Sequence, residues 1–240
     1  MKAIITFHSI DPSGTVLSYP PDAFASLLRG LQLSGLPLLT LDQILKPETD
    51  RGVVLTFDDG LSSVYTAALP VLRDFKAPAH LFLTTSMVGN SNQWTGQPDK
   101  APAFDMLSWQ QLETLHEAGV RIESHTHTHP DLRTLSTQQI EAECEQADTV
   151  IKNAVGRAPT YFAYPYGYRN KQASTCIQNR YKAAVTTELN WLGAHLDLAG
   201  LPRLDSYYLR GSWMRGHLDS AGSRLYLALR SRLRSLKGSQ

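Results

Sequence analysis

The sequence predicts an α/β protein whose single domain is a distorted (β/α)7-type barrel. Short apolar runs rich in β-branched residues alternate along the chain with longer runs in which apolar residues recur every three or four positions. This alternation is typical of parallel strands joined by crossover helices. The chain has 240 residues, which is an ordinary length for one α/β barrel, and no internal repeat or low-complexity linker divides it.

The expected strands are short apolar runs, each too short for a helix of typical length. Because a helical pattern follows most of them, we expect the strands to run parallel. Weaker runs lie near Leu38–Thr40 and near Leu201–Ser206. The well-marked strands are Ala3–Phe7, Val53–Phe57, Ala79–Thr84, Val120–Glu123, Thr160–Ala163 and Ala183–Thr187.

The segments between the strands carry their apolar residues on one helical face. One of them has clear end signals, since Ser108 is a favourable N-cap and Gly119 favours a helix end. The loop at 89–103 is rich in Gly, Asn, Gln and Pro, and we expect it to hang over the functional site. The expected helices are Pro21–Ser34, Ser62–Phe75, Ser108–Ala118, Ser136–Val155, Asn170–Asn179 and Asp219–Leu236.

The composition excludes several classes of protein. Hydrophobic residues make up 42% and charged residues 19% of the chain, as in a globular protein with a full core. The net charge of +1 gives no electrostatic case for binding nucleic acid. Cys144 and Cys176 are too few for a disulfide framework and are expected to be reduced thiols. No secretory leader and no membrane-spanning apolar run is visible, which predicts a cytoplasmic protein.

Three polar motifs follow three of the expected strands. They are Thr-Phe-Asp-Asp-Gly at 56–60, Ser-His-Thr-His-Thr-His-Pro at 124–130 and Phe-Ala-Tyr-Pro-Tyr-Gly at 162–167. The carboxyl ends of the strands are where barrels of this type place their chemistry. We therefore expect the three motifs to form one site.

The first two motifs offer the groups needed for a metal centre. Adjacent carboxylates such as Asp58 and Asp59 repel each other unless a cation or proton intervenes, although a solvated turn that caps the next helix would also use them. His125 and His129 come together on one face of an extended segment or one turn apart on a helix. Two imidazoles and one carboxylate can hold a metal with open positions, and His127 is an alternative third ligand. The remaining carboxylate can act as a base, which predicts metal-assisted hydrolysis of an amide or ester.

Three further residues are candidates for the same site. Tyr166 lies in a stiff Pro-Tyr-Gly turn that can aim its backbone N–H at an oxyanion. His8 ends the first strand and would open onto the same face of the barrel. Arg203 follows Leu-Pro near the end of a late strand, where we expect an ordinary surface salt bridge, with the orientation of a carboxylate as the alternative.

The C-terminal stretch is basic and amphipathic. Residues 219–240 contain Arg224, Arg230, Arg232, Arg234 and Lys237, with leucines between them. One interpretation is a helix packed on the barrel with a solvated charged face. The other is peripheral contact with an anionic membrane surface. We expect residues 1–218 to form the catalytic domain and 219–240 a basic amphipathic helix and tail.

The combination Thr-Phe-Asp-Asp-Gly, His-Thr-x-Thr-His-Pro-x-Leu and Tyr-Pro-Tyr-Gly resembles the polysaccharide deacetylase family, carbohydrate esterase family 4. The resemblance implies a seven-stranded distorted barrel and removal of an acyl group, usually acetyl, from a sugar. It implies a divalent metal, zinc first and cobalt or nickel as alternatives, on Asp59, His125 and His129. It also implies Asp58 as the general base and the Tyr166 N–H as an oxyanion donor.

The chain departs from the usual family pattern at two places. Ala163 stands where an arginine usually orients the base, and Arg203 is the candidate replacement for it. No late Leu-x-x-His motif is clear, so His8 is the expected acid, as in the subgroup similar to poly-N-acetylglucosamine deacetylases.

The resemblance predicts a substrate class and leaves rival functions open. The expected substrate is an N-acylated amino sugar in a glycan, a glycolipid or a nucleotide- or lipid-linked sugar. The rivals are an inert carbohydrate-binding relative, an amidohydrolase-like enzyme that uses His125 and His127, and a membrane-peripheral scaffold.

Overall fold

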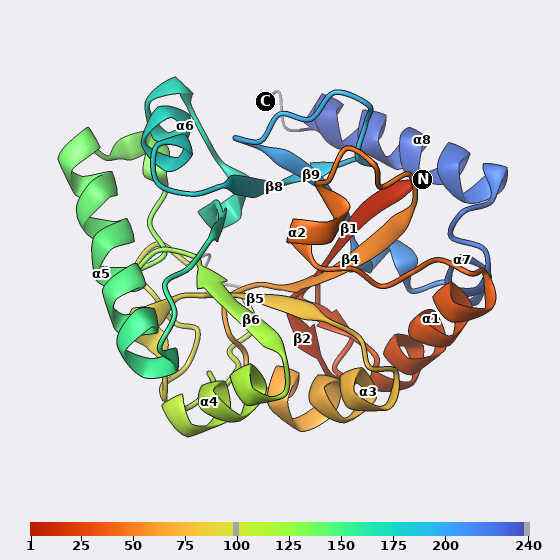
Figure 1. Cartoon of the computed structure of the whole chain (residues 1–240), viewed down its shortest axis with the longest axis horizontal. Helices are drawn as coiled ribbons and strands as arrows, with labels where there is room; N and C mark the ends of the chain where they lie inside the picture. Colours follow the sequence, from red (N-terminus) through yellow and green to blue (C-terminus); the bar gives the residue numbers. More distant parts are fainter. Residues whose placement is uncertain (98–100, 238–240) are drawn as a thin grey trace.

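The computed structural model describes residues 1–97 and 101–237, so the last three residues of the predicted tail and residues 98–100 of the predicted loop lie outside the described residues. Seven parallel strands close into a barrel with helices around it (Figure 1), which confirms the predicted fold class. In barrel order the strands are β1 (Lys2–Phe7), β4 (Gly52–Phe57), β5 (Ala79–Leu83), β6 (Val120–Ser124), β7 (Tyr161–Ala163), β8 (Ala183–Leu189) and β9 (Leu201–Asp205).

The weaker strand predictions have opposite outcomes. The run near Leu201 is β9, which pairs with both β8 and β1 and closes the barrel. The run at Leu38–Thr40 is not a barrel strand, because only Leu38 forms an isolated bridge, to Val53. Thr40 instead caps the short helix α2 (Leu41–Ile44) through a reciprocal capping box with Gln43. A separate pair, β2 (Ser9–Ile10) and β3 (Ser18–Tyr19), lies outside the barrel.

The predicted helices are present with small changes at their ends. Ser108 and Ser136 both form capping boxes, and Gly156 ends a helix in the left-handed conformation. The predicted helix at 62–75 begins as a π-helical turn and becomes α-helical only at Leu69, next to Pro70, which has no N–H to donate. The longer helices are α1 (Pro21–Leu33), α3 (Leu69–Asp74), α4 (Trp109–Glu117), α5 (Thr137–Val155), α6 (Lys171–Gln178) and α8 (Ala221–Lys237), with a short α7 (Ser212–Gly216) before the last.

The strands have a buried outer face and a buried inner face. Residues such as Phe7 and Phe57 pack outward against the helices in one apolar cluster. Ile4, Val54 and Phe82 belong to a second cluster that also contains Leu41 of α2. Figure 1 shows α2 in front of the centre of the barrel, at the amino ends of the strands. Helix α2 therefore closes the amino end of the barrel, whereas it does not cover the carboxyl end, where the polar motifs lie.

A buried polar pair joins α2 to the barrel. His80 Nδ1 lies 3.2 Å from Glu123 Oε1, and the backbone N–H of Leu41 donates to His80 Nε2 at 3.0 Å. Glu123 Oε2 also accepts the backbone N–H groups of Thr160 and Tyr161. Because every buried polar group here has a partner, the pair fixes α2 without an unsatisfied charge.

Helix α8 lies on the outside of the barrel and exposes most of its leucines to solvent. Leu227 is its buried leucine, whereas the leucine stripe (Leu225, Leu229, Leu233 and Leu236) is between 51% and 71% exposed. Two of its arginines turn toward the protein: Arg230 lies over the Tyr208 ring and Arg234 lies 3.5 Å from Asp205. The helix thus packs on the barrel as expected and keeps Arg224 and Arg232 exposed, but its solvent face also carries the leucine stripe, which was not expected.

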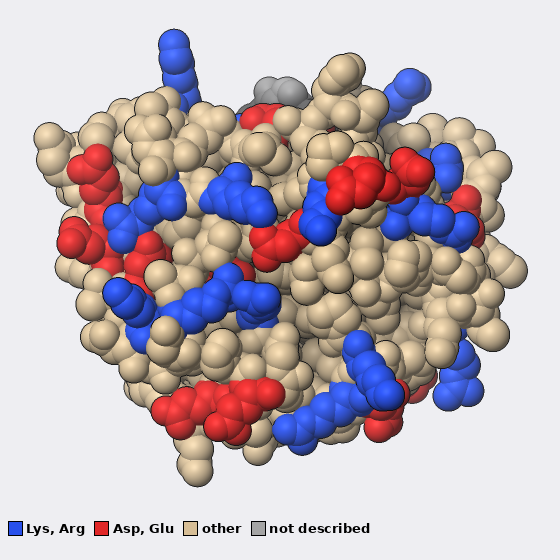
Figure 2. All heavy atoms as spheres, viewed as in Figure 1, with Lys and Arg blue, Asp and Glu red and all other residues tan. Residues whose placement is uncertain are grey.

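Charged side chains of both signs share one face of the molecule. On the face drawn in Figure 2, basic and acidic side chains are interspersed. Within residues 1–97 and 101–237, no helix is both long enough and apolar enough to cross a membrane.

Candidate active site

The structure brings Asp59, His125 and His129 together at the carboxyl end of the barrel. Asp59 Oδ1 lies 3.5 Å from His125 Nε2 and 3.6 Å from His129 Nε2. The three candidate ligand atoms all lie within 4.8 Å of one another, and all three residues are buried. One carboxylate oxygen and two imidazole nitrogens at these separations are a donor set that suits a divalent transition metal.

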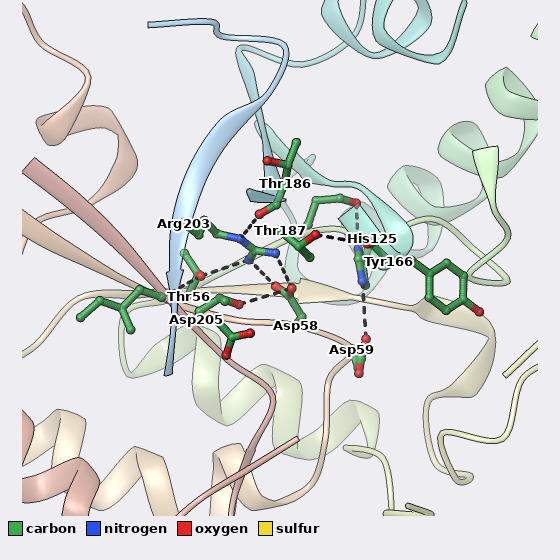
Figure 3. A network of polar contacts seen from close by, with 12 residues as sticks. Thr56, Asp58, Asp59, His125, Tyr166, Thr186, Thr187, Arg203 and Asp205 are labelled. Carbon is green, nitrogen blue, oxygen red and sulfur yellow. Dashed lines mark hydrogen bonds and ion pairs between the residues drawn. The ribbon is translucent and has the colours of Figure 1, made fainter. Parts of the chain in front are cut away.

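The ring of His125 is fixed by its second nitrogen. His125 Nδ1 donates to the carbonyl oxygen of Ala163 at 2.7 Å, so Nε2 is the nitrogen that faces Asp59 (Figure 3). This arrangement is common for histidines that bind metals. His127 is not part of the cluster, and its Nδ1 lies 2.8 Å from the hydroxyl of Thr85. The alternative that uses His127 as a ligand is therefore wrong.

Backbone strain is concentrated in this region. Of the five non-glycine residues with positive φ in residues 1–97 and 101–237, four are Asp59, Thr126, His129 and Tyr166. Each such residue is held in a sparsely populated conformation at a cost of about 1–3 kcal/mol. The left-handed turn at Asp59 lets two adjacent carboxylates reach one cavity, although neighbouring strand residues normally point to opposite faces.

Asp58 is held by a fully buried arginine. Arg203 Nη1 donates to Asp58 Oδ1 at 2.7 Å and Nη2 donates to Oδ2 at 2.6 Å (Figure 3). The same guanidinium donates from Nε to the carbonyl of Thr186 and from Nη1 to the hydroxyl of Thr56. Arg203 is 1% exposed, so the expectation of a surface salt bridge is wrong. This two-pronged contact fixes the plane of the Asp58 carboxylate.

The surroundings set the charges of Asp58, Asp59 and His129. Burial raises the pKa of Asp58, but the guanidinium of Arg203 outweighs it, so this pKa lies below the ordinary value. Burial also raises the pKa of Asp59, but the contact with His125 and the other nearby imidazoles outweigh burial and lower this pKa. Burial and the neighbouring His125 lower the pKa of His129 to about 3. At neutral pH, the two carboxylates are thus charged and the His129 imidazole is neutral.

Comparison with known proteins shows the family of this chain. The sequence model described as polysaccharide deacetylase matches residues 46–184, which is more than half of the chain. The chain belongs to the polysaccharide deacetylase family. The matched segment contains the two carboxylates, both histidines of the cluster and Tyr166, whereas His8 and Arg203 lie outside it.

Curated relatives of this family are similar over most of the chain. YxkH of Bacillus subtilis, provisionally named a polysaccharide deacetylase, is 29% identical over 193 residues, which are 77% of this chain and 64% of that protein. The poly-beta-1,6-N-acetyl-D-glucosamine N-deacetylase of Staphylococcus epidermidis is 28% identical over 164 residues, 61% of this chain and 53% of that protein. The chain thus spans between about half and two thirds of the length of these relatives.

Solved structures show the same fold. A Streptococcus pyogenes deacetylase, PplD, solved in complex with acetate, has a TM-score of 0.72 at 24% identity, with 85% of this chain and 91% of that one covered. IcaB from Ammonifex degensii has a TM-score of 0.70 at 23% identity, with 90% and 97% covered. These likenesses support the barrel as the fold of this deacetylase family member.

The predicted site residues other than Arg203 line a cavity over the cluster. Its volume is about 350 Å³, and His8, Asp58 and Tyr166 lie on its wall together with the three cluster residues. The Tyr166 turn is held by Thr187, whose hydroxyl donates to the Tyr166 carbonyl at 3.3 Å (Figure 3). A side chain at Gly167 would meet Thr187 Oγ1 at 2.1 Å, which explains the glycine of this motif.

The motifs assign no place in this site to Trp94. Trp94 lines the cavity and its indole Nε1 donates to the hydroxyl of Tyr166 at 3.1 Å. Nothing in the spacing of the motifs points to it. Its only signal is its place in the loop at 89–103, which we expected to lie over the site.

Proposed function

We propose that this protein is a metal-dependent hydrolase that removes the acetyl group from an N-acetylated amino sugar of a glycan. The observation that carries the proposal is a carboxylate held by a buried arginine beside an Asp-His-His cluster, with both opening into one cavity. The curated relatives named as N-deacetylases of poly-β-1,6-N-acetylglucosamine support the acetylated amino sugar as substrate.

The chain's own residues fit a divalent metal. Asp59, His125 and His129 would hold it, and the donor set favours zinc, with cobalt or nickel as alternatives. When bound, such a metal would polarise the acyl carbonyl and acidify a water molecule.

The other residues carry the proton transfers. Asp58 is the base that accepts a proton from the attacking water, and Arg203 keeps its carboxylate ionised and oriented. The backbone N–H of Tyr166 is the oxyanion donor, in a turn fixed by Thr187. His8, on the cavity wall, gives a proton to the leaving amine of the sugar.

The rival functions are less well supported. An inert relative was suggested by Ala163 in place of the usual arginine, but the guanidinium of Arg203 contacts Asp58 from β9. An amidohydrolase-like site would need His127, which faces Thr85 instead.

Acetate release tests the proposed function. Zinc-loaded protein is incubated with oligomers of β-1,6-linked N-acetylglucosamine, with chitin oligomers and with O-acetylated xylan, and free acetate is measured. We expect release from N-acetylated glucosamine oligomers. Protein that binds one zinc per chain and releases acetate from none of these, or only from the O-acetyl esters, contradicts the proposal.

The acid role of His8 predicts a dependence on the leaving group. His8→Gln should lower kcat on an N-acetylated sugar by about two orders of magnitude, because a departing amine needs a proton. The same change should alter hydrolysis of p-nitrophenyl acetate by less than about threefold, because phenolate departs without one. Equal losses on both substrates would rule out the acid role.

We also propose that helix α8 contacts an anionic membrane surface. Its leucine stripe faces solvent, and residues 221–237 contain four arginines, one lysine and no acidic residue. Arg224 and Arg232 are exposed beside the leucines. A helix with leucines on one side and basic residues beside them fits the boundary between acyl chains and anionic headgroups.

Vesicle binding tests this contact. The protein should sediment with vesicles of equal parts phosphatidylcholine and phosphatidylglycerol, and not with phosphatidylcholine alone. Replacing Leu229 and Leu233 together by Ser should weaken binding at least about tenfold, because each exposed leucine adds roughly 1.5–3 kcal/mol when buried. Leu33→Ser is the matched control, because Leu33 is an 82% exposed leucine on α1. Absence of vesicle binding, or dimerisation that depends on the stripe, contradicts the proposal.

A further inference from the structure

The two histidines of the cluster are held in different ways. The second nitrogen of His125 donates to the carbonyl of Ala163, as described above. The corresponding nitrogen of His129, Nδ1, is buried and has no hydrogen-bond partner among the described residues. Since a ligand histidine is normally oriented through its second nitrogen, another contact must fix the ring of His129.

Aromatic rings supply that contact. The indole of Trp94 lies against the His129 ring with centroids 4.1 Å apart and planes 34° apart. Tyr166 meets the same imidazole edge to face, with centroids 4.6 Å apart. The hydrogen bond from Trp94 Nε1 to the Tyr166 hydroxyl ties the two rings together. The imidazole of His129 is therefore packed by a linked pair of aromatic rings.

The backbone next to Trp94 is held by hydrogen bonds. Asn92, two residues before Trp94, is fully buried. Its side-chain oxygen accepts the backbone N–H of Phe104 at 2.7 Å. Backbone hydrogen bonds from Gly89 to Leu107 and between Asn92 and Phe104 join the two arms of this segment. Trp94 is only 8% exposed. The loop thus presents a fixed ring to the cluster.

We infer that Trp94 is a positioning residue for the metal site, whose indole holds the His129 ring in the orientation that binds a metal. The inference rests on the metal site of the proposed function. Stacking takes the place of the hydrogen bond that orients His125, and the Tyr166 hydroxyl fixes the indole in turn. The segment that carries Trp94 therefore contributes to metal affinity without providing a ligand.

The affinity of the apoprotein for Co²⁺ tests this inference directly. The dissociation constant is measured by competition with a coloured chelator for wild-type protein, Trp94→Ala, Trp94→Phe and Tyr166→Phe. We expect Trp94→Ala to weaken Co²⁺ binding about tenfold, which is the lower end of effects from groups that orient ligands. Trp94→Phe keeps an aromatic face and should restore affinity to within about threefold of wild type. Tyr166→Phe should fall between the two.

Two controls separate positioning from a general loss of structure. Trp213→Ala removes a tryptophan that is 47% exposed on α7 and should leave the affinity unchanged. The visible spectrum of bound Co²⁺, which reports ligand geometry, should change in Trp94→Ala and return in Trp94→Phe. If Trp94→Ala does not fold, Trp94→Leu fills the space without an aromatic face and is measured instead.

The outcomes distinguish the inference from the proposed function. Tight Co²⁺ binding by wild type with unchanged affinity and spectrum in Trp94→Ala overturns the role of Trp94 and leaves the metal site intact. Failure of wild type to bind Co²⁺ overturns both.

Discussion

Asp58→Asn is expected to lower kcat for deacetylation by about two to four orders of magnitude, which is the usual contribution of a positioned base. Asparagine keeps the size of the side chain but cannot accept a proton from water. The metal should stay bound at one ion per chain, since Asp58 is not one of the three cluster residues. The measurement is acetate release at saturating substrate, with metal content determined on the same sample.

The same change has a separate effect on stability. It leaves the guanidinium of Arg203 buried without its anion, and breaking a buried pair in this way costs about 3–5 kcal/mol. Asp58→Asn combined with Arg203→Met removes the unpaired charge, so it should recover part of the free energy of unfolding without recovering the rate. Near wild-type turnover by metal-loaded Asp58→Asn contradicts the base assignment. Recovery of the rate in the double variant contradicts it too.

His125→Ala is expected to remove the metal and the activity together. The cluster offers three candidate protein ligands, the number that catalytic zinc sites keep, so loss of one should weaken zinc binding by about a thousandfold or more. The imidazole also donates to Ala163, and its loss leaves a cavity between β6 and β7. Zinc content after dialysis and the dissociation constant from chelator competition are the measurements.

A neighbouring histidine provides the matched control. His127→Ala removes an imidazole two residues away that contacts Thr85 and lies outside the cluster, so it should keep one zinc per chain. Retention of zinc by His125→Ala, or its loss from His127→Ala, would show that the metal lies elsewhere.

Local patterns were enough to predict most of the fold. The six well-marked strands are barrel strands, because apolar runs followed by helical periodicity leave few alternatives. The prediction of a strand at Leu38–Thr40 was wrong, because the capping box at Thr40 starts a helix where the weak apolar run ends. The orientation of α8 could not be predicted either, since leucines and arginines alternate around it and tertiary contacts with Tyr208 and Asp205 decide which side turns inward.

The site shows a similar division. Asp59, His125 and His129 could be predicted because each belongs to a short motif at a strand end. The pairing of Arg203 with Asp58 joins residues 145 positions apart and depends on both side chains pointing inside the closed barrel. No local sequence pattern predicts that pairing. The stacking of Trp94 on His129 also depends on how a long loop folds back, which spacing alone does not reveal.

Zinc titration of the apoprotein, with acetate release as the readout, tests the central claim most directly. The substrate is a soluble oligomer of β-1,6-linked N-acetylglucosamine, and zinc is added in steps to protein stripped by a chelator. We predict that the rate rises in proportion to zinc and reaches its plateau at one ion per chain. Full activity without added metal, or no acetate release when one zinc is bound per chain, would contradict the claim.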